Sequence, residues 1–193
     1  MNTQDENYIR HACVVFRKTN EEFGGLSNMA PGFPLFFGET MIRTTEALYQ
    51  VCRFPQLPDV QKKIIDDPSP MGAKMASKPH RKQTRTDWDE VRTDIMRWCL
   101  RVKLAQNWDR FGNLLQSTGD KPIVEDSHKY RFWGAVPDGE FTLRGANVLG
   151  QLLMELRDQL RAAPDSLEIV EPLEIPDFLL LGEQIGSVRR VGS

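Results

Sequence analysis

Long apolar runs are missing from the sequence. No stretch approaches the roughly 18 consecutive apolar residues that a membrane-spanning helix needs, so we expect no transmembrane segment. The opening residues, MNTQDENYIR, are polar and carry no pattern of a secretory or transit signal. These two absences favour a cytoplasmic protein.

Cysteine and histidine are also scarce. The three cysteines, Cys13, Cys52 and Cys99, stand far apart and form no CxxC pair, and the three histidines are equally scattered. Disulfide frameworks and metal sites with nitrogen and sulfur ligands need closely spaced clusters of these residues. We therefore expect no disulfide framework, no bound metal and no cofactor.

Charge of one sign does not dominate the chain, but it is unevenly placed. The 193 residues are 40% apolar and 27% charged with a net charge of −2, which is ordinary for a soluble globular domain. Residues 74–85 hold five basic residues and no acid, whereas residues 165–183 hold six acids and no base. A basic cluster can collect phosphates, and it can equally be a solvated loop, so both interpretations stay open.

Short apolar runs between glycines and prolines predict a mainly helical α+β domain with a few short strands. Strands are expected over residues 12–16 and 33–37. Thr44 and Thr45 are cap candidates for a helix over residues 46–54, which Pro55 ends, and a second helix is expected over 59–67 before Pro68.

Apolar spacings of three and four predict a helix from residue 87 onwards, through Trp88, Val91, Ile95, Cys99 and Val102, and a helix over 147–161 with a stripe of leucines. A shorter helix is expected over 107–118, and residues 120–144 are expected to be irregular or to form short strands. We expect one domain over residues 1–163, followed by an acidic C-terminal appendage over residues 164–193.

Three polar residues of the first predicted helix share one face. Glu46, Gln50 and Arg53 stand at positions i, i+4 and i+7, a spacing that places them in one stripe. A carboxylate near a helix N-terminus is suited to accepting a proton or holding sugar hydroxyls, so the stripe can line a polar pocket. The same spacing also fits a solvated helix face.

Two further segments carry polar candidates. Ser27 and Asn28 lie in a glycine-rich loop, where backbone N–H groups can grip a ribose or phosphate; an Asx turn is the simpler interpretation. Lys74 stands among other cations. A lysine in such surroundings can act as a nucleophile, or it can simply bind phosphate.

The tryptophans fall into two groups. Trp88, Trp98 and Trp108 stand in predicted helices, where most of their surface should be core. Trp133 lies in YRFWGAVPDG, a turn-like segment in which an aromatic ring can stack on a base. Asp138 follows in the same segment and can hold a ribose or activate a water, although an Asp-Gly pair is also a turn signal.

Taken in order, these segments resemble the NADAR family, also called YbiA-like, from Val15 to Leu160. The resemblance is carried by LSNM at 26–29, EALYQ at 46–50, SPMGAK at 69–74, WDEVR at 88–92, MRWCLRVKLAQN at 96–107, LLQSTGDKPIVE at 114–125, FWG at 132–134 and GANVLGQLLMELR at 145–157. The phrases EFGGLSNMAPGFP, EALYQVCRFP and SPMGAKMASKPHRK are most similar to NADAR antitoxins paired with DarT-type DNA ADP-ribosyltransferases.

The resemblance implies a YbiA-like fold and an N-glycoside hydrolase. Some members cleave the ribose–nitrogen bond of riboflavin-pathway intermediates, and the toxin-associated members remove ADP-ribose from guanine in DNA. The family's pocket surrounds a helix glutamate, tryptophans and an aspartate, which correspond here to Glu46, Trp88, Trp133 and Asp138. A lysine that reacts with the opened ribose has been considered for the guanine-directed members, and Lys74 is the matching residue.

For this chain the resemblance implies ADP-ribosylated guanine in single-stranded DNA as the substrate and a DarT-type transferase as a candidate partner. Glu46 would stabilise the cationic ribose and handle the proton. The ribose, phosphates and base would be held by Ser27, Asn28, Gln50, Arg53, Trp88, Trp133 and Asn147. The DNA backbone would be held by Lys78, Arg81, Lys82 and Arg85.

Two departures from the family pattern affect these assignments. Many members carry lysine at the position of Arg53; arginine stays protonated and cannot form an imine, but it suits bidentate phosphate binding. Many members also carry aspartate at the position of Tyr130. Two other functions stay open: an N-glycosidase of riboflavin-pathway intermediates, which needs no DNA-binding surface, and a toxin-neutralising binding module that acts through the acidic segment 165–183.

Overall fold

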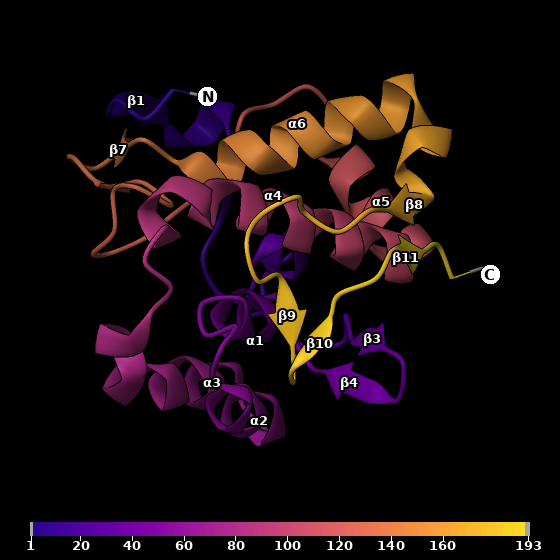
Figure 1. Ribbon diagram of the computed structural model, residues 1–193. Helices are drawn as coiled ribbons and strands as arrows, with labels where there is room; N and C mark the ends of the chain where they lie inside the picture. The colour runs from indigo at the N-terminus through magenta and orange to yellow at the C-terminus, as the bar shows by residue number, and fades with distance from the viewer. Residues whose placement is uncertain (1, 192–193) are drawn as a thin grey trace. The chain divides into compact units, whose positions relative to one another are not determined.

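A computed structural model describes residues 2–191 (Figure 1). It confirms the predicted α+β class, because α-helices and short, mostly antiparallel strands occur in separate runs along the described residues. Contacts divide the chain into two compact units: unit 1 comprises residues 2–27 and 109–164, and unit 2 comprises residues 28–108 and 165–191. Within the described range, no helix is long and apolar enough to cross a membrane.

Unit 1 is built from two small sheets, two short 3-10 helices and two α-helices. An antiparallel sheet has the strand order β1-β7-β6, and β2 pairs with β5 in parallel. The strands are β1 (Glu6–Ile9), β2 (Val14–Phe16), β5 (Ile123–Glu125), β6 (Val136–Pro137) and β7 (Thr142–Gly145). The helices are η1 (Arg10–Ala12), η2 (Gly24–Leu26), α5 (Trp108–Ser117), whose first residue belongs to unit 2, and α6 (Val148–Ala162).

The core of unit 1 follows the predicted pattern. Helix α6 buries the stripe that its leucine spacing predicts, and it packs against β5. The segment over residues 120–144 forms short strands, as expected. A buried cluster joins the two sheets through Tyr8, Val124, Ala135 and Leu143.

Unit 2 holds the other helices and the remaining strands. Its helices are α1 (Thr45–Val51), α2 (Pro58–Asp66), α3 (Pro70–Ser77), the 3-10 helix η3 (Lys78–Gln83) and α4 (Trp88–Gln106). The 3-10 helix η4 (Pro164–Leu167) leads into its C-terminal part. Its strands form three antiparallel pairs or hairpins: β3 (Leu35–Phe37) with β4 (Thr40–Ile42), β8 (Ile169–Val170) with β11 (Val188–Arg189), and β9 (Leu179–Leu180) with β10 (Glu183–Gln184).

Helix α1 begins where the threonines predict. The Thr44 side-chain oxygen accepts the backbone N–H of Ala47 at 3.2 Å, so Thr44 is the N-cap. Every residue from Thr45 to Val51 is buried, because α2, α3 and α4 all contact this short helix. The helix ends before Arg53, which lies in the turn that follows.

Helix α3 is an element that the sequence analysis does not predict. Pro68, Pro70 and Gly72 suggest an interruption, but Pro70 occupies the first helical position, where its missing N–H costs nothing. The hydroxyl of Ser69 accepts the N–H of Gly72 at 2.8 Å and caps the helix. Lys74 therefore lies on a helix that packs beside α1 and α2 (Figure 1).

Helix α4 is buried more widely than one apolar face. Of the predicted stripe, Val91 is half-buried and the other four residues are buried: Trp88, Ile95, Cys99 and Val102. Beyond Ile95 most other positions are buried as well, since β3, β8 and β11 pack against the C-terminal half of this helix. The C-terminal half of α4 is therefore buried on most of its sides, and not only on one apolar face.

The predicted acidic appendage is a packed part of unit 2. Trp98 donates its indole N–H to Glu171 O at 3.0 Å and meets the Phe178 ring edge-to-face at 4.8 Å. Apolar residues alternate with the acids and are buried: Leu167, Val170, Phe178, Leu180, Ile185 and Val188. The expectation of a separate appendage is therefore corrected. It rests on the many acidic residues of this segment, and these do not show that the apolar residues between them are buried.

Candidate active site

The predicted polar stripe on α1 is buried. Glu46 is 7% exposed and Gln50 is 4% exposed. The Gln50 amide donates from Nε2 to Glu46 Oε1 at 2.9 Å, and the backbone N–H of Glu46 donates to Asn28 O at 2.9 Å. A stripe with this little exposure is not a solvated helix face, and its role in lining a binding pocket stays a prediction.

Arg53 adds to the polar contacts between Glu46 and Gln50. Its Nη1 donates to Gln50 Oε1 at 3.4 Å, and its guanidinium lies 4.4 Å over the Trp88 ring. Burial lowers the pKa of Arg53, and the nearby Arg81 lowers it further. The cation is thus held in place by an amide on one side and an aromatic ring on the other.

Trp88 supports Arg53 instead of offering an open surface. The indole is 6% exposed and lies 5.0 Å from the Tyr49 ring, measured between ring centroids. Burial also raises the pKa of Tyr49. Because the indole is covered, the predicted stacking of Trp88 on a base is replaced by stacking against Arg53.

Lys74 reaches the same carboxylate from α3. Its Nζ lies 4.0 Å from Glu46 Oε1, and its side chain is 36% exposed against 10% for that of Glu46. The structure therefore brings together four residues predicted from the sequence, which are Glu46, Gln50, Arg53 and Lys74.

This arrangement favours one kind of chemistry. The Glu46 carboxylate accepts one amide N–H bond from Gln50 and lies 4.0 Å from the Lys74 amine, while Arg53 binds the other end of the Gln50 amide. An ionised carboxylate can stabilise a sugar cation and take a proton from water, while the arginine fork can hold a phosphate oxygen. The arrangement therefore suits a reaction in which positive charge develops on an anionic substrate.

Two buried polar atoms next to Glu46 have no hydrogen-bond partner within residues 2–191. They are Asn28 Oδ1 and Thr45 Oγ1, and their residues are 6% and 1% exposed. The sequence predicts Asn28 as a binding residue. It does not single out Thr45, because a threonine before a helix is first a cap candidate, and only the structure shows that Thr44 takes that role.

Asn147 lies in unit 1 and has a structural role. It is fully buried with φ 51°, and its side chain donates to Ile123 O at 2.8 Å and accepts from Glu125 N at 3.1 Å. These bonds join the start of α6 to β5. They use the amide that the sequence analysis assigns to a ribose, so the predicted ligand contact is corrected.

Asp138 is explained by its turn. It is exposed between β6 and β7, its N–H donates to Thr142 O at 2.9 Å, and Gly139 follows at φ 92°. A positive φ of this size favours glycine. The geometry therefore accounts for the Asp-Gly pair as a hairpin turn, and the predicted catalytic role of Asp138 stays a prediction.

Trp133 and Ser27 also belong to unit 1. The Trp133 ring is half-buried and meets the Phe132 ring edge-to-face at 5.0 Å. Ser27 is buried, and its N–H donates to Gly24 O at 3.1 Å, which closes η2. Their predicted roles in base stacking and ribose binding stay predictions.

The basic cluster divides into exposed and buried members. Lys78, Arg81 and Lys82 are exposed on η3. Arg85 has a side chain only 5% exposed that donates to Asp87 Oδ1 at 2.6 Å and to Pro176 O at 2.7 Å. The same pair lowers the pKa of Asp87. Arg85 is therefore corrected from a DNA contact to a structural cation.

The cysteines are packed thiols. All three are free, with Cys52 and Cys99 buried and Cys13 partly buried. Burial raises the pKa of Cys99 and of Cys13. Across the described residues, no group of three or more His, Cys, Asp or Glu side chains is placed to hold a metal ion.

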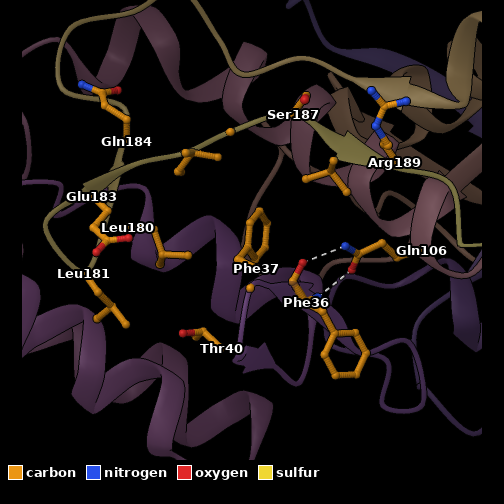
Figure 2. Close-up of a pocket in the computed structure, with 14 residues that line it drawn as sticks. Phe36, Phe37, Thr40, Gln106, Leu180, Leu181, Glu183, Gln184, Ser187 and Arg189 are labelled. Carbon is orange, nitrogen blue, oxygen red and sulfur yellow. Dashed lines mark hydrogen bonds between the residues drawn. The ribbon is translucent and has the colours of Figure 1, made fainter.

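A separate groove of about 500 Å³ lies in unit 2 between the β3–β4 hairpin and the C-terminal segment (Figure 2). The Gln106 side chain binds one strand edge there: Phe36 N donates to Gln106 Oε1 at 2.6 Å, and Gln106 Nε2 donates to Phe36 O at 2.8 Å. The residues that line the groove include none of those predicted for catalysis or binding.

Comparison with known proteins decides the family. The sequence profile of the NADAR domain matches residues 15–161. The chain belongs to the NADAR domain family. The matched range includes α1, α3 and the start of α4, which carry Glu46, Lys74 and Trp88, and it ends before the C-terminal part of unit 2. The NADAR resemblance seen in the sequence is therefore confirmed.

Individual NADAR relatives agree in sequence and in structure. A riboflavin biosynthesis protein of Vibrio vulnificus (strain YJ016) is 32% identical over 170 residues, covering 87% of this chain but only 44% of that protein. The N-glycosidase YbiA of Escherichia coli (strain K12) is 30% identical, covering 80% of this chain and 92% of that protein. The NMR structure of E. coli YbiA has a TM-score of 0.65 at 30% identity and covers 80% of this chain and 88% of that one.

Proposed function

We propose that this protein is an N-glycosidase that removes ADP-ribose from guanine bases in DNA. The glycosidase part is supported by its NADAR relatives, among them proteins named N-glycosidase YbiA. The ADP-ribosylated DNA part is supported by the sequence phrases shared with NADAR antitoxins and by the exposed cations on η3. A DarT-type transferase is the partner that this role implies.

One observation carries the proposal: a buried carboxylate lies within a series of polar contacts between side chains. Glu46 receives the Gln50 amide at 2.9 Å and faces the Lys74 amine at 4.0 Å. Cleaving a glycosidic bond makes a cationic, oxocarbenium-like ribose, and an ionised carboxylate stabilises that charge where water is largely excluded.

The reaction adds one water across the bond between ribose C1′ and the guanine amino nitrogen. The C–N bond breaks with its electron pair staying on nitrogen, which takes up a proton. The water oxygen bonds to C1′ while Glu46 accepts one of its protons. The products are unmodified guanine and ADP-ribose with a hydroxyl on C1′.

Lys74 gives the same geometry a second route. The Lys74 amine can attack C1′ of the ring-opened ribose and form an imine, and the guanine amino nitrogen leaves C1′ with a proton taken from the lysine amine. One water then hydrolyses the imine, which gives ADP-ribose in its open aldehyde form and frees the lysine amine. Both routes end with water attack at C1′ beside Glu46. They differ in whether the protein is covalently attached to the sugar during turnover.

The charges around the site fit a pyrophosphate and a nucleic acid strand. Arg53 offers a planar guanidinium backed by Trp88, which suits a phosphate oxygen. Lys78, Arg81 and Lys82 follow directly after α3, which carries Lys74. These three exposed cations are suited to a DNA backbone that leads into the site.

A second candidate function has its own support. Relatives from Vibrio vulnificus and maize are named riboflavin biosynthesis proteins, and the chain spans 44% and 27% of their lengths. An N-glycosidase of riboflavin-pathway intermediates would use Glu46 in the same way and would not need the η3 cations. Neutralisation of a toxin by binding alone is the third alternative, since most acids of residues 165–183 are exposed.

A paired assay separates these functions. The purified protein is incubated with an oligonucleotide that carries ADP-ribosylated guanine and, separately, with riboflavin-pathway ribosyl phosphates. The proposal predicts release of ADP-ribose from the oligonucleotide without any toxin present. Release of ribose phosphate alone would favour the riboflavin role, and no turnover of either substrate would favour a binding module.

A further inference from the structure

Helix α3 exposes two methionines on the side that faces away from its buried residues. Met71 is 59% exposed and Met75 is 51% exposed, whereas Ala73 and Ser77 are buried. A single exposed apolar side chain is common on protein surfaces and needs no explanation. These two stand at positions i and i+4, where side chains of a helix are neighbours. They therefore form one continuous apolar surface on α3.

Two lysines share this side of the helix. Residues 71, 74, 75 and 78 follow the spacing i, i+3, i+4 and i+7, which defines one helix face. Lys78 directly follows α3 and keeps helical backbone angles, φ −63° and ψ −42°, so the spacing extends to it. The Lys74 amine lies 4.0 Å from Glu46 Oε1. The α3 face, made of these four residues, is therefore continuous with the candidate active site.

A single strand of nucleic acid matches the chemistry of the α3 face. Unstacked bases present flat apolar surfaces, and the backbone between them carries one negative charge per phosphate. Methionine side chains are flexible and polarisable and make favourable contacts with aromatic rings, so they can adapt to any base. Residues 74–85 hold five basic residues and no acid, which favours a polyanion as the molecule that covers this face.

We propose that Met71 and Met75 bind the bases that flank the ADP-ribosylated guanine in a single strand. This inference rests on the proposed N-glycosidase function and names a further part of its substrate, the neighbouring nucleotides. The methionines hold the flanking bases by apolar contact, and Lys78 with the following η3 cations holds phosphates. The modified nucleotide is thereby placed beside Lys74 and Glu46. Because every base has an apolar face, these contacts bind DNA without reading its sequence.

Substrates with abasic neighbours test this role. Two single-stranded oligonucleotides each carry one ADP-ribosylated guanine; one has normal flanking bases and the other has abasic sites in their place, so both keep the same phosphates. The wild-type KM should be about fivefold to tenfold lower for the strand with flanking bases. The double variant Met71→Ala/Met75→Ala should have the same, raised KM for both strands, with kcat near wild type.

The alanine variant is expected to fold, since alanine favours helices and both positions are exposed. Met71→Leu/Met75→Leu keeps an apolar surface and should retain most of the preference for flanking bases. Met41→Ala removes a methionine that is 38% exposed on β4 and should leave both KM values unchanged. The alanine variant should also keep the wild-type salt dependence of DNA binding, because it removes no charge.

Two results would overturn the inference. One is an equal wild-type KM for the two strands, which would show that the flanking bases are not bound. The other is an alanine variant that still prefers the strand with flanking bases, which would place their binding elsewhere on the protein.

Failure of the proposed function gives a different result, namely no turnover of either strand by the wild-type protein. Binding of the two strands without the ADP-ribose group is then measured by fluorescence anisotropy. Tighter binding of the strand with bases, lost in the alanine variant, would keep Met71 and Met75 as a base-binding surface although the glycosidase is overturned. Equal affinities would overturn the base-binding surface as well.

Discussion

At the scale of single residues, the contacts of Lys74 show which cation pairs with the Glu46 carboxylate. Its Nζ lies 4.0 Å from Glu46 Oε1, and Arg53 reaches the same group through Gln50. Lysine can give up its proton and become a nucleophile, whereas arginine holds its proton. Of the two cations, Lys74 is therefore the one that pairs with the carboxylate and the one whose side-chain type can form a covalent bond with a sugar.

Lys74→Arg separates the charge of Lys74 from its nucleophilicity. If Lys74 forms an imine, borohydride added during wild-type turnover should trap a covalent adduct with ADP-ribose, which mass spectrometry would locate on the Lys74 peptide. The arginine variant keeps the positive charge but should lose both adduct and turnover while it still binds ADP-ribose. An active Lys74→Arg protein without adduct would reduce Lys74 to a phosphate contact and leave direct water attack.

At the scale of elements, the proposed role of η3 in binding DNA depends on its three exposed cations, Lys78, Arg81 and Lys82. Binding to single-stranded DNA should weaken as salt rises, because each phosphate contact releases counterions. Changing Lys78, Arg81 and Lys82 to alanine should reduce the slope of log affinity against log salt by roughly 0.7 to 1 for each phosphate that the variant no longer neutralises.

A matched control for the η3 variant lies on the neighbouring helix α2. Lys62 and Lys63 are exposed there, so changing both to alanine removes positive charge without touching η3. The salt slope of this control should stay near wild type. Equal slopes for the wild type and the η3 variant would show that the η3 cations are merely solvated.

Helix α4 contains a buried cation with consequences for stability. Burial lowers the pKa of Lys103 from its ordinary 10.5 to about 7, and its Nζ lies 4.6 Å over the Phe33 ring. Below pH 7 the amine is charged in both the folded and unfolded states, and the folded state carries the whole cost of burying it. Between pH 7 and 10.5 the unfolded state binds the proton more strongly, so stability rises with pH.

Lys103→Met tests this dependence. The variant should be more stable than the wild type by a few kcal/mol near pH 6, and the gain should shrink as the pH rises towards 10. Urea denaturation at several pH values measures the difference. Lys62→Met, at an exposed position, should show no such pattern, and a pH-independent gain for Lys103→Met would contradict the account.

Elements with local signals could be predicted from the sequence, and elements that depend on packing could not. The Thr44 cap and the α6 leucine stripe are read directly from short patterns. Helix α3 escapes prediction because Pro70 and Gly72 break helices in most positions, and only its Ser69 cap reveals a start. The Glu46 stripe is predicted, but its burial depends on three other helices that no local pattern encodes.

At the scale of the whole molecule, unit 2 joins the NADAR segment 28–108 to the C-terminal residues that the family profile does not cover. The Gln61 side chain receives Leu181 N at 2.6 Å and donates to Leu179 O at 3.0 Å, so α2 is tied to this C-terminal part. Arg85 makes a similar connection through Pro176 O. The acidic segment therefore contributes to the stability of the unit that holds Glu46.

Phe178→Ala measures that contribution. The ring is 3% exposed and packs against Trp98, so its removal should lower the free energy of unfolding by about 3 kcal/mol. Phe36→Ala removes a ring that is 48% exposed and should cost much less. Denaturant unfolding compares the two, and equal small losses would show that the C-terminal part is only loosely attached.

Glu46→Gln tests the central claim, that the buried carboxylate of α1 performs glycosidic bond cleavage. Glutamine keeps an oxygen for the Gln50 amide and removes only the charge, so folding and ADP-ribose affinity should stay near wild type. The single-turnover rate of ADP-ribose release from a modified oligonucleotide should fall by at least about a hundredfold. A Glu46→Gln protein that releases ADP-ribose at a near-normal rate would contradict the assignment of this site.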